Sequence, residues 1–322
     1  TTVSTEPTYR EGQGRVNELS SWEISIIFIG LVGLLGNAFV VLVILSSKAL
    51  RKNITTAYLI NQSTIDALAS LFMILQTLIT TESHGNELYC RLWLSNTFLW
   101  VLFINSSSNL MAITIERLVA TWMPLWHRVS LTRTKQLLTV AIIWLPGLTI
   151  GVAQGYIGSG IVDSQCWPYG LGGKTVEYMG YVTIAFEYVL PIVIFIFSYT
   201  KIALILRAKP VNSTSDSHKK SIQVIKVLLL LTACFFICWT PNAVYYFLQL
   251  SGYVPDFTSG WYLLSILAVN MNCCCNPFVY LFKYRDFQKA IKNMFNRSKV
   301  APLNSRTSDG KRITTTEGRA NP

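Results

Sequence analysis

The chain has 322 residues, of which 51% are hydrophobic and only 13% are charged, and its formal net charge is +11. Few soluble domains are so poor in charge, and the apolar residues form long blocks that do not follow the periodicity of a soluble core. The basic residues lie mostly in short loops, with no face of base-reading or stacking groups, so nucleic acid is not an expected partner.

Seven blocks are long and apolar enough to cross a membrane, which takes about 20 residues of helix. In chain order they cover roughly 24–46, 56–80, 92–116, 136–157, 180–206, 224–250 and 260–283. Because lipid offers the backbone no hydrogen-bond partner, each block is predicted to be a helix and not a strand. The predicted fold class is therefore an all-α membrane protein built on a seven-transmembrane helix bundle.

Lysine and arginine residues in the short loops predict the orientation of the bundle. The loops after the first, third and fifth blocks are basic, as is the chain beyond Lys283, whereas the opposite loops are mixed or acidic. The N-terminus is therefore predicted outside the cell and the C-terminus inside, in the plasma membrane. We expect 1–23 to be a disordered extracellular segment, 24–283 the transmembrane domain and 297–322 a disordered cytoplasmic tail near anionic lipid.

Two of the seven cysteines, Cys90 and Cys166, are the ones at the predicted outer surface, where disulfides form. A bridge between them would hold the loop before the fifth block over the mouth of the bundle, and two free thiols are the alternative. Cys273, Cys274 and Cys275 point in different directions around a helix, so they cannot converge on one metal ion. They are interpreted as small packing residues.

Some residues inside the blocks are unusual in a membrane helix. Asp66 is an acid at mid-membrane depth, and an ionisable group there indicates function, with a purely structural role as the alternative. Pro277 follows Asn276 deep in the last block, where a proline frees a backbone carbonyl and kinks the helix. Pro146, Pro191 and Pro241 lie inside other blocks.

Motifs along the blocks resemble the rhodopsin-like family of G-protein-coupled receptors over about 24–295. In chain order they are Gly36-Asn37, Asp66, Cys90, Glu116-Arg117-Leu118, Trp144, Pro191 with Tyr199, Phe235 with Cys238-Trp239-Thr240-Pro241, and Asn276-Pro277-Phe278-Val279-Tyr280. One motif alone would be a weak signal, but all of them in order on the expected helices form a specific one. The resemblance also implies a short amphipathic eighth helix over 284–296.

The chain departs from the family pattern in three places. Leu118 stands where the family usually has Tyr, and Ser221 stands where some members carry an acid that pairs with Arg117. The spacing from Cys90 to Arg117 is about two residues longer than usual, and we expect a bulge or a shifted helix start to absorb it.

The resemblance implies a receptor whose extracellular ligand shifts an equilibrium between a closed and an open bundle. The sixth helix then moves outward about its proline kink, and a heterotrimeric G protein binds the cytoplasmic cleft, so that ligand and G protein strengthen each other's binding. The implied activation switch comprises Glu116, Arg117, Tyr199, Phe235, Trp239, Pro241, Asn276, Pro277 and Tyr280. Receptor kinases and arrestin are the partners implied for Ser305, Thr307, Ser308 and Thr314–Thr316 of the tail.

The resemblance also implies a sodium pocket, with sodium as an allosteric ion and no other cofactor. Its residues are Asp66, Ser106, Asn272 and Asn276, lined by Trp239. A hard cation prefers oxygen ligands that include a carboxylate, which this set offers. The alternative is a hydrogen-bonded network that holds only water.

The ligand class is constrained by two positions. Leu99 stands where amine receptors carry Asp, and Asn270 stands where visual pigments carry Lys, so neither an amine nor retinal is expected. Candidate ligand contacts in the outer half are Gln76, Leu99, Trp100, Phe103, Glu187, Asn242, Tyr245, Tyr246, Tyr262 and Asn270. Anchoring at the membrane interface is the alternative for the aromatic residues.

Glu187 lies one turn before Pro191 with no Lys or Arg near it in the block. We expect it to bind a cationic group of the ligand, and a structural pair with Tyr or Asn is the alternative. The loop around Cys166 resembles the hairpin loop of peptide receptors, so a neuropeptide is the favoured ligand.

Three other classes of function differ from a peptide receptor in what their sequences would show. A transporter or channel would show internal repeats and paired broken helices, which the sequence lacks. A lipid or small-metabolite receptor, or one active without a ligand, would have a closed lid and a more apolar pocket. An enzyme is not expected, because the sequence shows no arrangement of nucleophile, base and oxyanion donors.

Overall fold

The computed structural model describes residues 19–52, 55–79, 86–167, 173–208, 216–252, 256 and 259–300, although not the side chains of 216–221 and 297–300. The predictions for 1–18 of the N-terminal segment and 301–322 of the tail lie outside the described residues, as does the side chain of Ser221. The elements are α1 (Ser21–Ser46), α2 (Lys48–Arg51), α3 (Thr56–Ile79), α4 (Glu87–Tyr89), η1 (Cys90–Leu94), α5 (Thr97–Trp122), α6 (Pro124–Ser130), α7 (Arg133–Pro146), η2 (Gly147–Gly151), α8 (Val152–Gly158), β1 (Gly160–Val162), β2 (Gln165–Trp167), α9 (Lys174–Ile184), η3 (Ala185–Val189), α10 (Leu190–Ala208), α11 (Asp216–Leu250), α12 (Gly260–Lys283) and α13 (Arg285–Val300), where η marks a π-helical turn.

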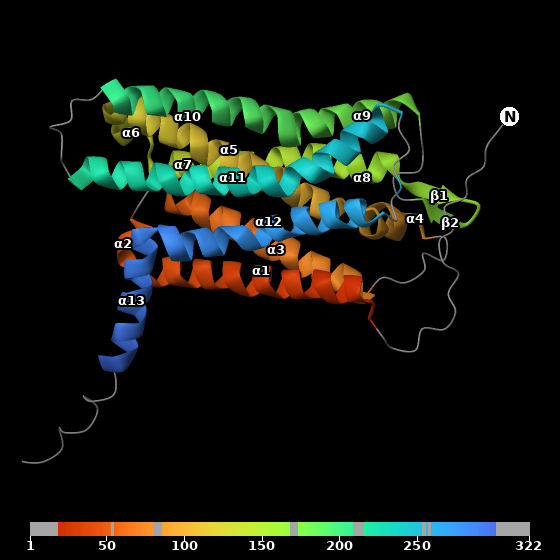
Figure 1. The fold of residues 1–322 in the computed structure, drawn as a ribbon, viewed down its shortest axis with the longest axis horizontal. Coiled ribbons are helices and arrows are strands. Elements are labelled where there is room, and N and C mark those ends of the chain that lie inside the picture. The colour runs from red at the N-terminus through yellow and green to blue at the C-terminus, as the bar shows by residue number, and fades with distance from the viewer. Residues whose placement is uncertain are drawn as a thin grey trace, which may run out of the picture.

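Seven helical segments of the described chain are long and apolar enough to cross a membrane. The first, second, sixth and seventh spans are α1, α3, the part of α11 from Ile222 to Leu250, and α12. The third, fourth and fifth spans each contain a π-helical turn: α4-η1-α5, α7-η2-α8 and α9-η3-α10. Figure 1 shows these helices side by side in one bundle, with the β1–β2 hairpin at one end and α13 turning away at the other. The predicted seven-helix fold and short C-terminal helix are confirmed.

The third span begins irregularly, in the region where the long spacing from Cys90 to Arg117 predicted a bulge. Cys90–Leu94 form the π-helical turn η1, and Asn96 adopts a left-handed conformation with φ of 55° before α5 starts at Thr97. A π-helical turn accommodates an extra residue within a helix, and a left-handed residue redirects the chain. The structure therefore contains both the predicted bulge and the predicted shift of the helix start.

The third span also ends later than the prediction of 92–116. Glu116 and Arg117 lie within α5, which continues to Trp122. The helix stops at Met123, whose ψ of 67° is not helical, because the following Pro124 disfavours a helical conformation in the residue before it. Pro124 then opens the short helix α6, where its missing N–H costs no hydrogen bond.

Three glycines on one face of the fourth span bring it into close contact with α5. A Cβ at Gly151 would lie 2.7 Å from the backbone nitrogen of Val101, and a Cβ at Gly147 or Gly155 would overlap Asn105 or Thr97. The spacing of four residues places all three on the same side of the helix. Small residues of this kind let two membrane helices approach backbone to backbone.

Candidate functional site

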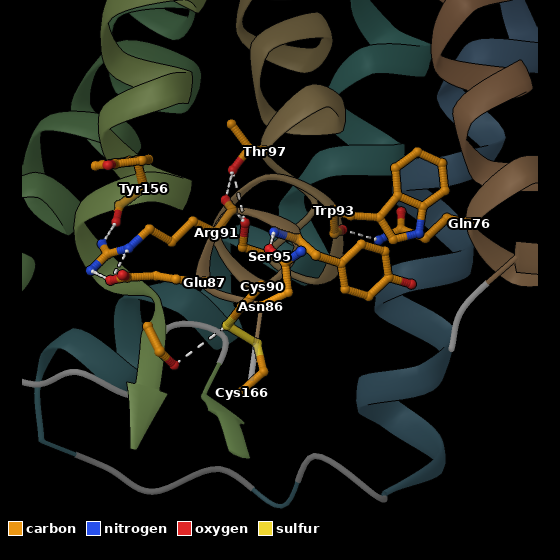
Figure 2. The surroundings of a disulfide bond; sticks show 12 residues. Gln76, Asn86, Glu87, Cys90, Arg91, Trp93, Ser95, Thr97, Tyr156 and Cys166 are labelled. Atoms are coloured by element: carbon orange, nitrogen blue, oxygen red, sulfur yellow. Dashed lines mark hydrogen bonds and ion pairs between the residues drawn. A yellow bond between two sulfur atoms is a disulfide. The ribbon is translucent and has the colours of Figure 1, made fainter. Parts of the chain in front are cut away.

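The outer end of the third span is tied to the β-hairpin by a disulfide between Cys90 and Cys166 (Figure 2). Their Cα atoms are 5.5 Å apart, and Cys166 pairs with Ile161 across the two antiparallel strands. The hairpin turns at Asp163 and Ser164, which both have positive φ, as the tight turns of hairpins require. The predicted disulfide is confirmed against the alternative of two free thiols.

Two side chains beside the disulfide brace this end of the bundle, and Figure 2 shows both. Arg91 forms an ion pair of 2.7 Å with Glu87 and donates a hydrogen bond to the backbone carbonyl of Tyr156. The guanidinium carbon of Arg91 also lies 4.7 Å from the centre of the Tyr156 ring. Gln76, a predicted ligand contact on α3, donates from Nε2 to the carbonyl oxygen of Trp93 at 2.8 Å. That amide therefore holds η1 against the second span.

A buried hydrogen-bond chain links the fourth, fifth and sixth spans in the outer half. Gln154 Nε2 on α8 donates to the Tyr246 hydroxyl on α11 at 2.5 Å, and the Thr183 hydroxyl on α9 donates to Gln154 Oε1 at 3.0 Å. The ring of Trp100 on α5 lies 6.3 Å from the ring of Tyr246. Gln154 and Thr183 are not recognisable as site residues in the sequence, because each is an isolated polar residue near the end of an apolar block.

Glu187 lies on the π-helical turn η3 and is only 4% exposed. Its Oε1 is buried and has no hydrogen-bond partner among the described residues, and Tyr246 lies within electrostatic range of it. Proline at the start of α10 and the π turn just before it alter the regular hydrogen bonding of the fifth span here. This carboxylate therefore reaches the interior of the outer half with at least one oxygen unsatisfied.

The other predicted ligand contacts are Leu99, Phe103, Asn242, Tyr245, Tyr262 and Asn270. Tyr245 and Tyr262 meet edge to face at 5.6 Å and join the outer ends of α11 and α12. Leu99 is buried in an apolar cluster with Met73 and Cys273. Phe103 packs edge to face on Trp239, Asn270 is buried on α12, and Asn242 is partly buried on α11.

A second polar chain crosses the middle of the bundle from the fourth span to α3. The indole Nε1 of Trp144 donates to Asn61 Oδ1 at 3.0 Å, and Asn61 Nδ2 donates to Asn109 Oδ1 at 3.0 Å. Asn109 Nδ2 donates to Gln62 Oε1 at 2.8 Å and to the carbonyl oxygen of Tyr58 at 3.0 Å. These amides are buried, so each bond satisfies a group that is costly to leave unpaired in lipid.

This chain of hydrogen bonds ends at the carboxylate of Asp66, which is completely buried. Gln62 Nε2 lies 3.2 Å from both carboxylate oxygens, the Ser106 hydroxyl donates to Oδ1 at 3.3 Å, and Asn276 Nδ2 donates to Oδ2 at 2.5 Å. Spans two, three and seven therefore meet at one carboxylate. Asn272 joins Gln62, Ser106 and Asn276 in lining a small cavity beside them.

Trp239 lies apart from this cavity lining. It packs against Phe103 at 5.4 Å and Phe235 at 5.9 Å, and its indole nitrogen is buried without a hydrogen-bond partner among the described residues. Phe235, in contrast, lines the cavity, together with Tyr280. The aromatic residues of α11 thus connect the polar centre to the outer half of the bundle.

At the cytoplasmic end, Glu116 and Arg117 form a compact network. Arg117 Nε lies 2.5 Å from Glu116 Oε2, and Arg117 Nη2 donates to the Thr55 hydroxyl. The imidazole of His127 on α6 lies 2.6 Å from Glu116 Oε1. Tyr199 on α10 shares a hydrogen bond of 3.0 Å with Thr232 on α11.

The membrane-spanning part of the chain matches a known protein family. Residues 36–280 match the family described as 7 transmembrane receptor (rhodopsin family). The chain belongs to this family. It is therefore a receptor and not an enzyme, and its seven spans make it a multi-pass membrane protein.

Individual relatives of the receptor are distant in sequence. Galanin receptor 2b of Danio rerio is 28% identical over 292 residues, covering 85% of this chain and 75% of that protein. The Substance-K receptor of Homo sapiens is 26% identical over 297 residues, covering 86% and 73%. The crystal structure of squid rhodopsin superposes with a TM-score of 0.70 at 17% identity, covering 87% of this chain and 86% of that one, which shows the shared fold.

The receptor brings most of its predicted site residues into three groups. Asp66, Ser106, Asn272 and Asn276 meet at the polar centre, Trp100, Glu187 and Tyr246 gather in the outer half, and Glu116 and Arg117 lie at the cytoplasmic end. Pro241 and Pro277 lie inside α11 and α12, and Tyr280 is buried with its ring 6.3 Å from Phe287 of α13.

Four further residues complete these groups and were not expected to do so: Thr55, Gln62, Asn109 and His127. Thr55, Gln62 and His127 bond the predicted residues Arg117, Ser106 and Glu116. Asn109 bonds Gln62, which lies 47 positions away in the sequence, so packing of the bundle brings these two together. A polar residue on the inward face of a membrane block was the available signal, and the second block carries several.

Proposed function

We propose that this receptor binds a peptide at its extracellular end, in the plasma membrane with its N-terminus outside, and activates a heterotrimeric G protein. Binding beneath the β1–β2 hairpin shifts the equilibrium toward a bundle in which α11 has moved outward. The Tyr199–Thr232 bond between α10 and α11 opens in this step, and Arg117 leaves Glu116 and Thr55 to line the cytoplasmic cleft.

The buried carboxylate of Glu187 carries the peptide proposal. A charge in a site of low dielectric is costly unless a countercharge accompanies it, and the ion pairs of the described residues do not include Glu187. A lysine, an arginine or the amino terminus of a peptide supplies that countercharge. The neighbouring Tyr246 and Trp100 supply the aromatic surface that commonly surrounds such an anchor.

The relatives support the same ligand class. Galanin receptor 2b and the Substance-K receptor are named for neuropeptides, and both align over most of the chain. A lipid or an uncharged metabolite would leave Glu187 without a partner, so those ligand classes suit the outer half less well.

The test is G-protein activation in cells that express the receptor, screened against a library of neuropeptides. Once a peptide responds, Glu187→Gln is compared with Glu177→Gln, an exposed acid on the neighbouring helix α9. We expect Glu187→Gln to raise the half-maximal concentration by about 10- to 100-fold, because it removes one member of a buried charge pair. Glu177→Gln is expected to leave it unchanged.

Three results would count against parts of this proposal. A peptide response that Glu187→Gln does not weaken keeps the peptide class and removes Glu187 as the anchor. Silence toward all peptides together with a response to a lipid, or with strong signalling in the absence of ligand, overturns the peptide class. The G-protein partner itself is rejected if no G-protein family responds under any condition.

A further inference from the structure

The amide nitrogen of Gln62 occupies the position beside Asp66 where the family resemblance placed a sodium ion. Nε2 is 3.2 Å from each carboxylate oxygen and 2.6 Å from the Ser106 hydroxyl oxygen. The side chain is 4% exposed, and its two N–H groups are both directed at the residues expected to hold the ion. In the sequence, Gln62 is one of several polar residues that interrupt the second apolar block.

The orientation of this amide is determined by its neighbours at both ends of the polar chain. The indole of Trp144 can only donate a hydrogen bond, so Asn61 must present its oxygen to Trp144 and its nitrogen to Asn109. The carbonyl oxygen of Tyr58 can only accept, which directs Asn109 Nδ2 toward both Tyr58 and Gln62. Gln62 must therefore turn its oxygen to Asn109 and its nitrogen to Asp66.

The alternative orientation of Gln62 would break bonds along this whole chain. Turning Gln62 Oε1 toward Asp66 would set an oxygen against a carboxylate and face Nε2 against Asn109 Nδ2. Rotating Asn109 in turn would leave the Tyr58 carbonyl facing an oxygen. Each step leaves buried polar groups unpaired, at a cost of about 1–3 kcal/mol for each group.

The donor set therefore does not fit a sodium ion. A hard cation needs free oxygen lone pairs, and it is repelled by N–H groups that point into its site. Asp66 accepts from Gln62 and Ser106 on Oδ1 and from Gln62 and Asn276 on Oδ2. Ser106 accepts from Gln62 as well, and Asn276 presents nitrogen, so the carboxylate that the ion would need is already surrounded by hydrogen-bond donors.

We propose that the Gln62 amide is a built-in substitute for the sodium ion, so that this receptor is insensitive to sodium. The amide joins the second span to the third through Ser106, and Asp66 joins both to the seventh through Asn276. An ion in this place would make the same connections between spans. The receptor therefore keeps the link at Asp66 that favours the closed bundle while losing its control by an external cation.

The first test needs no ligand, because it measures the thermal stability of the purified full-length receptor. Melting temperatures are compared in sodium chloride and in choline chloride at equal ionic strength, since choline is too large for the site. The wild-type receptor is expected to melt at the same temperature in both salts. Asp66→Asn in either salt reports whether any difference comes from this carboxylate.

The decisive variant is Gln62→Ala, which removes the amide and leaves room for an ion with water. We expect sodium to raise its melting temperature by about 2–4 °C over choline, as a ligand present above its Kd would. The gain should disappear in the double variant Gln62→Ala with Asp66→Asn. Gln62→Ser, which also removes the amide and leaves space at the site, serves if Gln62→Ala does not fold.

A matched control is Gln136→Ala, which makes the same change at another buried glutamine on α7, outside the polar centre. It should show no sodium response. The proposal is overturned if sodium stabilises the wild-type receptor through Asp66. It is also overturned if folded Gln62→Ala and Gln62→Ser receptors both ignore sodium.

Discussion

His127 Nε2 lies 2.6 Å from Glu116 Oε1, while the other carboxylate oxygen of Glu116 lies 2.5 Å from Arg117 Nε. One buried carboxylate thus joins the short helix α6 to the arginine of the third span. Arg117 is held from its other side by the Thr55 hydroxyl at the start of the second span. Among the described side chains, the hydrogen bonds and ion pairs that hold Arg117 come from Glu116 and Thr55 and not from the sixth span.

Replacing His127 by phenylalanine should therefore raise signalling in the absence of ligand. The change keeps a ring of similar size but removes the hydrogen bond to Glu116, and charge-assisted bonds of this kind contribute about 1.5–3 kcal/mol. Part of that stabilisation belongs to the closed bundle, so we expect basal G-protein activation to increase by about 3- to 10-fold. The measurement is nucleotide exchange on the G protein at matched receptor levels.

The matched control for this prediction is Arg128→Ala, the next residue along α6, whose side chain is exposed. It should leave basal signalling unchanged. Equal basal activity in His127→Phe and the wild-type receptor would mean that the bond to Glu116 does not restrain Arg117.

A second prediction concerns the contact of the fourth span with α5. Gly151→Ala would place a Cβ 2.7 Å from the backbone nitrogen of Val101, which no side-chain rotation relieves. Overpacking of this kind costs about 1–3 kcal/mol, so the melting temperature should fall by several degrees. Gly260→Ala is the control, because a Cβ at Gly260 would meet no atom within 4 Å. A Gly151→Ala receptor as stable as the Gly260→Ala receptor would show that the two spans can separate freely.

The sequence predicted the seven spans from local patterns, the disulfide from the topology and the irregular start of the third span from a spacing that departs from the family resemblance. Long apolar blocks predict membrane helices whatever their neighbours are. The disulfide followed from the predicted topology, which left Cys90 and Cys166 at the outer surface. The later end of the third span could also have been predicted from a local signal, since Pro124 directly follows its last residues.

The bonding partners inside the bundle could not be predicted in the same way. The direction of the Gln62 amide depends on Trp144 in the fourth span and Asn109 in the third, which approach it only after packing. The polar residues around Asp66 in the sequence therefore suggested a sodium site, whereas the orientation of the amides in the bundle supports the Gln62 amide in that position. The apolar cluster that Leu99 forms with Met73 and Cys273 likewise depends on packing between spans.

A third prediction addresses the disulfide at the outer end. Cys166→Ser should lower the melting temperature and the amount of receptor at the cell surface, because losing a native disulfide costs about 2–5 kcal/mol. Cys275→Ser, which changes a free and partly buried thiol on α12, should have little effect on either quantity. Normal surface expression and melting of Cys166→Ser would show that the hairpin keeps its place without the covalent bond.

The last prediction concerns the link between the outer ends of the fourth, fifth and sixth spans. Tyr246→Phe removes the acceptor of the 2.5 Å bond from Gln154 Nε2, and it leaves that buried amide with one bond from Thr183. We expect a loss of stability of about 1–2 kcal/mol, because an unsatisfied buried donor costs more than the bond itself contributes. If the two residues act through this bond, Gln154→Met combined with Tyr246→Phe should destabilise less than the sum of the single changes.

Tyr245→Phe is the control, since its ring contact with Tyr262 survives the loss of the hydroxyl. Strict additivity of the two single changes would show instead that Tyr246 and Gln154 stabilise the outer half independently.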